Sequence, residues 1–196
     1  FKRNLNKTDV KVAQLAGYVS EHAAYHHGEA SLQGAIINMA QNFVGSNNIN
    51  VLMPNGQFGT RIMGGSDSAS PRYIHTELNP IVDTIYPKDD MSLLTYTDDD
   101  GLLVEPEYYV PIIPMVLVNG MVGIGTGFST NIPLFNPQKI INNIKRKLNG
   151  DKYYVMHPYY NNFKGKIEPK PGDKNVYITK GVYIVYPNDN KVIITE

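Results

Sequence analysis

The sequence predicts an α+β fold, made of short helices and small hairpins in two successive domains. An apolar fraction of 42% is enough to form a buried core. Apolar residues recur at helical spacing over residues 10–43, whereas residues 177–194 alternate in the manner of strands. The 196 residues are enough for one large domain, or for one domain and part of a second.

The first segments are predicted to form two helices separated by a tight turn. Residues 10–23 carry apolar side chains at helical spacing, and Thr8 or Asp9 can cap this helix. Gly28 interrupts the pattern, which then resumes over residues 29–43. Two short helices joined by a turn that contains glycine indicate a helix-turn-helix.

A β-hairpin is predicted directly after the two helices. Residues 50–53 and 59–63 flank a turn sequence, PNG, at residues 54–56. A helix-turn-helix followed by a hairpin is the layout of a winged helix, which commonly sets its second helix into a DNA groove. A small helical bundle with an unrelated hairpin fits the same pattern.

The remaining elements are predicted from turn residues and caps. They are a helix at 74–85 that is broken by Asn79 and Pro80, a hairpin made by 93–96 and 102–104, a helix at 136–150, and strands at 177–179, 182–186 and 191–194. Asn136 is a favourable cap, and Pro137 suits the first helical turn. Pro111 and Pro114 mark a change of pattern, so a domain boundary is expected near residue 110.

Charge is unevenly distributed, although the formal net charge is zero. Residues 77–107 hold nine acidic residues and one lysine, whereas residues 108–196 hold eleven basic residues and five acidic ones. A neutral total can therefore hide basic surfaces suited to DNA. The absence of cysteine excludes disulfides and cysteine-based metal sites, and no apolar run is long enough to cross a membrane.

One short segment, SASPRY at residues 68–73, points to phosphate chemistry. The nearby Gly64, Gly65 and Pro71 favour a turn that exposes Tyr73. A phenol with a pKa near ~10 is a poor nucleophile at neutral pH. A neighbouring guanidinium, here Arg72, can stabilise both the phenolate and the charge on a phosphate under attack. For an isolated Arg-Tyr pair, a surface cation beside a half-buried aromatic ring is the simpler interpretation.

Several further motifs surround this pair in a fixed order. They are YHHGE (25–29), NFVGSNN (42–48), GQFGTR (56–61), GGSDSASPRY (64–73), EPEYY (105–109), PIIPM (111–115) and GIGTG (123–127). Together they resemble the breakage-reunion core of eukaryotic-type (type IIA) DNA topoisomerase II. The resemblance is dense from about residue 11 to about residue 133 and thinner beyond. It implies a winged-helix DNA-binding domain at 1–110 and the start of an α/β tower domain at 111–196.

The resemblance also implies roles for individual residues. Tyr73 would attack a DNA phosphodiester and keep the 5′ phosphate as a covalent ester, and Arg72 would hold that phosphate. The catalytic histidine would be His27 rather than His26. Ile124, the isoleucine of the glycine-rich motif, would wedge between base pairs.

Other binding residues are expected within the same segments. Contacts to DNA are expected from Lys11, Gln57 and Ser70. A zinc site made by His22, His26 and Glu29 is allowed by spacing but lacks the glutamate of metalloproteases between the histidines. The acidic triplet at residues 98–100 is interpreted as turn chemistry, so no metal site is expected in this chain.

The implied function is transient double-strand DNA cleavage, strand passage and religation by a homodimer. Mg²⁺ and ATP would be bound by parts of the full-length protein outside this chain, and the chain, without an initiating Met, would be a fragment that is inactive alone. The alternative is a non-catalytic winged-helix DNA-binding module. Localisation would be the nucleus for a cellular enzyme, or the host cytoplasm for a large DNA virus that replicates there.

Overall fold

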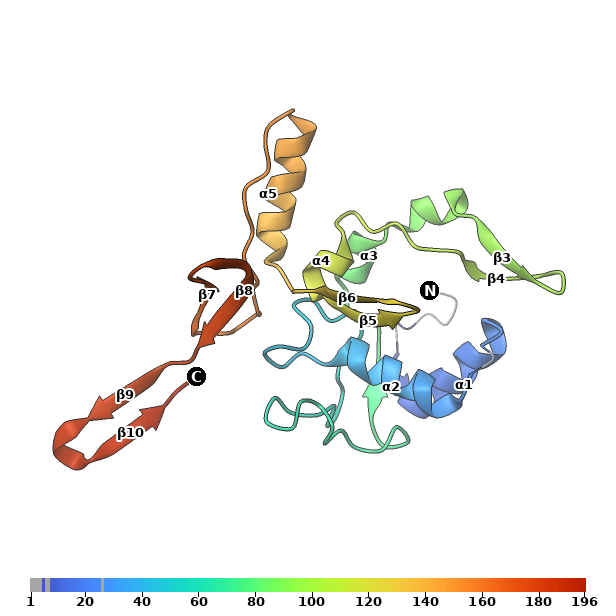
Figure 1. Ribbon diagram of the computed structural model, residues 1–196. Helices are drawn as coiled ribbons and strands as arrows, with labels where there is room; N and C mark the ends of the chain where they lie inside the picture. The colour runs from blue at the N-terminus through green and yellow to red at the C-terminus, as the bar shows by residue number, and fades with distance from the viewer. Residues whose placement is uncertain (1–4, 6–7, 26) are drawn as a thin grey trace. The chain divides into compact units, whose positions relative to one another are not determined.

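The structure, a computed structural model, describes residue 5 and residues 8–25 and 27–196. It divides into two compact units, Phe1–Pro114 and Met115–Glu196. Each unit mixes short helices with small antiparallel sheets, so the fold is α+β, as the sequence predicts (Figure 1). Among the described residues, each sheet consists of two strands. No helix in that part of the chain is both long enough and apolar enough to span a membrane.

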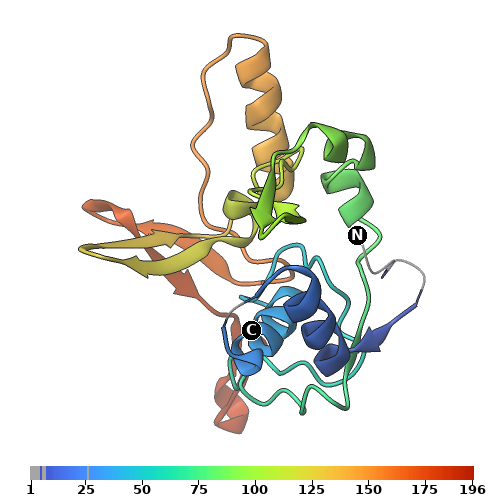
Figure 2. The ribbon, with the colours of Figure 1, turned by 90° about the vertical axis from the view of Figure 1, so that its right-hand side faces the viewer.

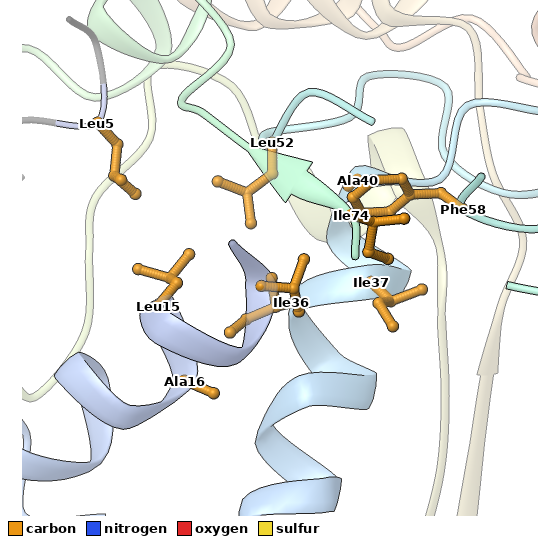
Figure 3. Close-up of a cluster of buried hydrophobic side chains, with 10 residues drawn as sticks. Leu5, Leu15, Ala16, Ile36, Ile37, Ala40, Leu52, Phe58 and Ile74 are labelled. Atoms are coloured by element: carbon orange, nitrogen blue, oxygen red, sulfur yellow. The ribbon is translucent and has the colours of Figure 1, made fainter. Parts of the chain in front are cut away.

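Two packed helices form the centre of the first unit. Helix α1 (Val12–His22) and helix α2 (Glu29–Ala40) contact each other, in agreement with the two predicted helices. Their buried residues recur at helical spacing and meet further apolar side chains from the loops (Figure 3). The buried cluster consists of Leu5, Val12, Leu15, Ala16, Ile36, Ile37, Ala40, Leu52, Phe58 and Ile74.

The start of α1 differs from the prediction. Val10–Lys11 form a short strand, β1, which pairs antiparallel with β2 (His75–Thr76). The helix therefore begins at Val12, with Lys11 at the N-cap position and no side-chain cap. The predicted cap by Thr8 or Asp9 is wrong, because the strand lies between those residues and the helix.

The predicted hairpin between residues 50–53 and 59–63 does not form. Leu52 makes an isolated antiparallel bridge with Leu78 instead, and Asn55 makes one with His75. Phe58, which lies between the two predicted arms, is buried in the core and is 3% exposed. Leu52 therefore pairs with Leu78, whereas the predicted hairpin would have paired residues 50–53 with residues 59–63.

The helix predicted at 74–85 is also wrong over most of its length. Its first residues belong to β2, and only α3 (Val82–Ile85) is helical. The side-chain oxygen of Asn79 accepts a hydrogen bond from the Ile81 amide at 3.2 Å. This turn, which contains Pro80, delays the start of the helix.

The acidic hairpin agrees with the prediction, although its first strand begins at Tyr96 rather than at residue 93. A 3₁₀ helix, η1 (Lys88–Leu93), leads into β3 (Tyr96–Asp99), which pairs antiparallel with β4 (Leu102–Pro106). The Asp98 carboxylate accepts a hydrogen bond from the Gly101 amide at 2.8 Å. This contact confirms that the acidic triplet serves the turn.

The second unit begins with a short helix and a two-stranded ribbon. Helix α4 (Met115–Asn119) leads into β5 (Met121–Gly125), which pairs with β6 (Phe128–Ile132), and Figure 2 shows the two strands as an extended hairpin. The predicted helix at 136–150 is confirmed as α5 (Pro137–Leu148). Its cap, Asn136, accepts hydrogen bonds from the amides of Gln138 and Lys139 at 2.9 and 3.3 Å.

Two further hairpins complete the second unit and contain the predicted late strands. Strand β7 (Lys166–Lys170) pairs with β8 (Asp173–Lys180). Strand β9 (Tyr183–Tyr186) pairs with β10 (Lys191–Ile194) across a short 3₁₀ turn, η2 (Pro187–Asp189).

Candidate active site

Arg72 and Tyr73 lie in an exposed turn of the first unit. The Tyr73 amide donates a hydrogen bond to the Ser70 carbonyl at 2.9 Å, which closes the turn. The Tyr73 side chain is 68% exposed. The guanidinium carbon of Arg72 lies 5.0 Å from the centroid of the Tyr73 ring, within the range of a cation–π contact. A substrate phosphate that approaches the phenol would therefore also meet the guanidinium.

The first turn of α1 holds both sides of this exposed turn. The Ala13 amide donates to the Pro71 carbonyl at 3.1 Å, and the Val12 amide donates to the Ile74 carbonyl at 3.0 Å. The first amides of a helix have no acceptor within the helix, so these carbonyls satisfy them. Ile74 itself is 2% exposed and belongs to the core. Tyr73 is thus displayed on a backbone that is fixed on either side.

The chain that leads to this turn, residues 57–73, is called here the tyrosine loop. Two main-chain hydrogen bonds cross it, from the Ala69 amide to the Gln57 carbonyl and from the Gly65 amide to the Thr60 carbonyl, each at 2.9 Å. The Asp67 carboxylate accepts from the Thr60 amide at 2.7 Å and from the Thr60 hydroxyl at 2.9 Å. The hydrogen bond from the Thr60 amide is the largest effect on the pKa of Asp67 and lowers it, so this carboxylate is charged at neutral pH.

A buried glutamine joins the base of the tyrosine loop to α2. Gln41 follows the last residue of α2, and its side-chain amide donates to the carbonyls of Phe58 at 2.9 Å and Gly65 at 3.3 Å. Gly65 has a φ of +85°, and a Cβ placed there would clash with the Gln41 side-chain amide. Only glycine fits this position without a shift of the glutamine.

Three of the predicted DNA-contact residues lie around the same turn. Lys11 is exposed beside the start of α1 and is in register with His75 of β2. Gln57 is exposed at the beginning of the tyrosine loop, and its amide nitrogen lies 3.4 Å from the Asp67 carboxylate. Ser70 is exposed at the first position of the turn. The structure therefore brings these residues together with Arg72 and Tyr73.

The other predicted site residues lie on separate segments. His27 is exposed between α1 and α2, where its ring packs edge-on against Tyr25 with centroids 5.4 Å apart. Ile124 belongs to β5 of the second unit and is 93% exposed, which is unusual for isoleucine. An exposed apolar tip on a hairpin is free to enter another molecule.

The zinc alternative would use His22, His26 and Glu29. His26 lies outside the described residues. His22 is exposed, and its Nδ1 atom lies 2.9 Å from the Tyr18 carbonyl while its ring stacks on that of Tyr18. In the part of the chain that the structure describes, no group of three or more His, Cys, Asp or Glu residues could hold a metal ion.

Two residues of the site are not predicted from the sequence. Asp67 and Gln41 hold the tyrosine loop together, Asp67 through Thr60, seven positions away, and Gln41 through carbonyls 17 and 24 positions away. The signal available for Asp67 is its place in a turn-rich segment, where aspartate commonly binds backbone amides. For Gln41, the signal is a polar residue next to the apolar Met39 and Ala40 near the end of the helix predicted at 29–43.

Comparison with known proteins decides the family. A family model that describes the A subunit of DNA gyrase/topoisomerase IV matches residues 1–196. The chain belongs to this family. Two relatives that match this topoisomerase-family chain over its whole length are DNA topoisomerase 2 of Bombyx mori, 57% identical, and DNA topoisomerase 2-alpha of Rattus norvegicus, 54% identical. The chain spans only 12% and 13% of those two proteins.

A solved structure supports the same assignment at the level of the fold. The topoisomerase-family chain is similar to a crystal structure of the Plasmodium falciparum topoisomerase II DNA-binding, cleavage and re-ligation domain. The TM-score is 0.90 at 51% sequence identity, with 96% of this chain and 25% of that chain covered.

Proposed function

We propose that the chain is part of a type II DNA topoisomerase and that Tyr73 is its nucleophile. The observation that carries this proposal is the exposed phenol of Tyr73, which shares a backbone-anchored turn with Arg72 in a chain of the topoisomerase family. A side chain that must reach a DNA phosphate has to be accessible, and its backbone has to be fixed so that attack is in line.

The proposed reaction is a reversible transfer between two esters. The phenol oxygen of Tyr73 forms a bond to a DNA phosphorus atom, the phenol proton is lost, and the bond from phosphorus to the 3′ oxygen breaks. The freed 3′ oxygen gains a proton, and the 5′ phosphate stays on the tyrosine. Because one phosphate ester replaces another, the 3′ hydroxyl can reverse the step and reseal the strand.

Neighbouring residues would support this transfer. The permanent charge and fork geometry of Arg72 suit a phosphate whose negative charge increases during attack. His27 would donate a hydrogen bond to a phosphate oxygen. Lys11, Gln57 and Ser70 would contact the DNA near the scissile bond. The exposed Ile124 would unstack a base step, as apolar wedges do in proteins that bend DNA.

The full-length protein would cleave both strands of one duplex, pass another through the gap and reseal the break. It would act as a homodimer. Residues 1–110 would form the winged-helix DNA-binding domain, with isolated bridges to residues 75 and 78 in place of the predicted hairpin, and residues 111–196 would begin the tower domain. The relatives come from cellular eukaryotes, so we place the protein in the nucleus and find no support for a viral source.

Mg²⁺ and ATP are assigned to parts of the full-length protein outside this chain. Among the described residues, no group of three or more His, Cys, Asp or Glu could hold a metal ion, which is compatible with this assignment. When bound nearby, Mg²⁺ would offset negative charge on the phosphate.

The proposal is tested by covalent trapping of DNA with the full-length protein and with a Tyr73→Phe variant. Phenylalanine removes the phenol oxygen and keeps the ring, so we expect adduct formation to fall below detection while DNA binding is retained. Denaturation of the protein on radiolabelled duplex measures the adduct. Equal adduct formation by both proteins would exclude Tyr73 as the nucleophile. Absence of any adduct from the unaltered protein would favour the non-catalytic DNA-binding module.

A further inference from the structure

We propose that Asp67 is a positioning residue that holds the tyrosine loop so that Tyr73 is aligned for attack. The inference rests on the proposed function, since it assumes that Tyr73 is the nucleophile. Asp67 acts through Thr60, the main chain and the Gln57 side-chain amide, which lies 3.4 Å from its carboxylate, and it need not touch the DNA itself.

The hydrogen bonds of Asp67 join the two arms of the tyrosine loop. Its carboxylate belongs to the returning arm and accepts from the amide and the hydroxyl of Thr60 in the outgoing arm, at 2.7 and 2.9 Å. The returning arm then leads through Ala69, whose amide bonds to the Gln57 carbonyl, into the turn that carries Tyr73. Loss of the carboxylate would therefore loosen the segment directly before the nucleophile.

Gln41 holds the part of the tyrosine loop that faces the core, and Asp67 holds the part that lies nearer to the exposed turn. The Gln41 side chain is buried and bonds to the Phe58 and Gly65 carbonyls. Asp67 is only half-buried, and it lies on the part of the loop nearer to the exposed turn. Removal of Asp67 should thus affect the loop while the core beneath it stays packed.

The charge of Asp67 argues against a role in binding DNA. A carboxylate close to a DNA-binding segment repels phosphate and lowers affinity. The hydrogen bonds from Thr60 lower the pKa of Asp67 and keep it charged, so this repulsion persists at neutral pH. A negative charge at such a place is explained by the hydrogen bonds that it accepts, because charged acceptors form stronger bonds to backbone amides than neutral ones do.

If Asp67 only positions Tyr73, its loss should slow covalent adduct formation without weakening the binding of DNA by the full-length protein. In an Asp67→Asn variant we expect the rate of covalent adduct formation to fall about ten- to a hundredfold, because small misplacement of a reacting group has effects of this size. Affinity for a short duplex, measured by fluorescence anisotropy, should be unchanged or tighter, because a repulsive charge is gone. A matched control is Ser66→Ala, since the Ser66 hydroxyl bonds to the Met63 carbonyl rather than to Asp67. The control should keep the unaltered rate.

A second pair of variants tests the partner of Asp67. Thr60→Val removes the hydroxyl donor and should slow adduct formation, whereas Thr60→Ser keeps the donor and should restore it. Hydrogen exchange at the Ala69 and Tyr73 amides should become faster in Asp67→Asn. A fall in adduct rate that only matches a fall in DNA affinity would overturn the inference.

The two proposals can fail separately. An adduct that forms at the normal rate with Tyr73→Phe would overturn the proposed function. Normal amide exchange together with a normal adduct rate in Asp67→Asn would overturn the positioning role, whichever way Tyr73→Phe behaves.

Discussion

At the scale of single residues, the candidate site combines features that a sequence reveals with contacts that it hides. The exposure of Arg72 and Tyr73 follows from local composition, because glycine, serine and proline favour turns. The contact of Gln41 with Gly65 joins residues 24 positions apart, and no local pattern indicates it. The sequence could thus suggest the reacting group but not the side chains that hold it.

Gly65 offers a test of how closely the tyrosine loop is packed. Gly65→Ala would place a Cβ against the Gln41 amide, whereas Gly64→Ala would place one in open space at a similarly positive φ. Both changes carry the left-handed backbone cost of about 1 kcal/mol. Overpacking should add about 1–3 kcal/mol for Gly65→Ala alone. Urea unfolding of the two variants measures the difference, and equal losses of stability would contradict the close contact.

At the scale of elements, the sequence predicts those whose stabilising contacts are local. Helices α1 and α2 follow from apolar spacing, α5 follows from its cap and its first-turn proline, and the acidic hairpin follows from its turn. Strands β1 and β2 have two residues each and pair across more than sixty positions, so they carry no periodicity. The helix predicted at 74–85 failed because residues 75–76 take part in this distant pairing and the turn at Asn79 delays the helix to Val82.

The cap of α5 can be tested by one substitution. Asn136→Ala removes the oxygen that accepts from the Gln138 and Lys139 amides, so the helix should lose about 1 kcal/mol of stability. Asn142→Ala is the matched control, because Asn142 is exposed within the same helix and alanine is the better helix former there. Thermal unfolding followed by circular dichroism compares them. A control that destabilises as much as Asn136→Ala would contradict the capping role.

At the scale of the whole molecule, the proposed site residues are divided between the two compact units. The exposed Tyr73 belongs to the first unit and the exposed Ile124 to the second. The chain is also a small part of the relatives that it matches, 12% of the Bombyx mori protein. Several motifs that occur in one order could predict the family from the sequence, because their resemblance to the family does not depend on how the chain folds.

We expect residues 1–196 alone to bind duplex DNA weakly and not to cleave it. Among the described residues no group of three or more His, Cys, Asp or Glu could hold a metal ion, and the proposed reaction needs charge neutralisation on the phosphate beyond Arg72. Incubation with duplex DNA and Mg²⁺, followed by denaturation, should reveal no covalent adduct, while the full-length protein serves as the positive control. Metal-dependent trapping by this segment alone would show that its own residues complete the site.

The hydrogen bonds between α1 and the Tyr73 turn also have a mechanical consequence. If Tyr73 carries a severed DNA end, any tension in that DNA pulls on the main chain at residue 73. The Pro71 and Ile74 carbonyls lie on either side of this point and bond to the first amides of α1, whose side chains Val12 and Leu15 are buried in the core. These hydrogen bonds would transmit the force to the packed core of the unit. The turn that carries the broken DNA end would therefore keep its position under tension.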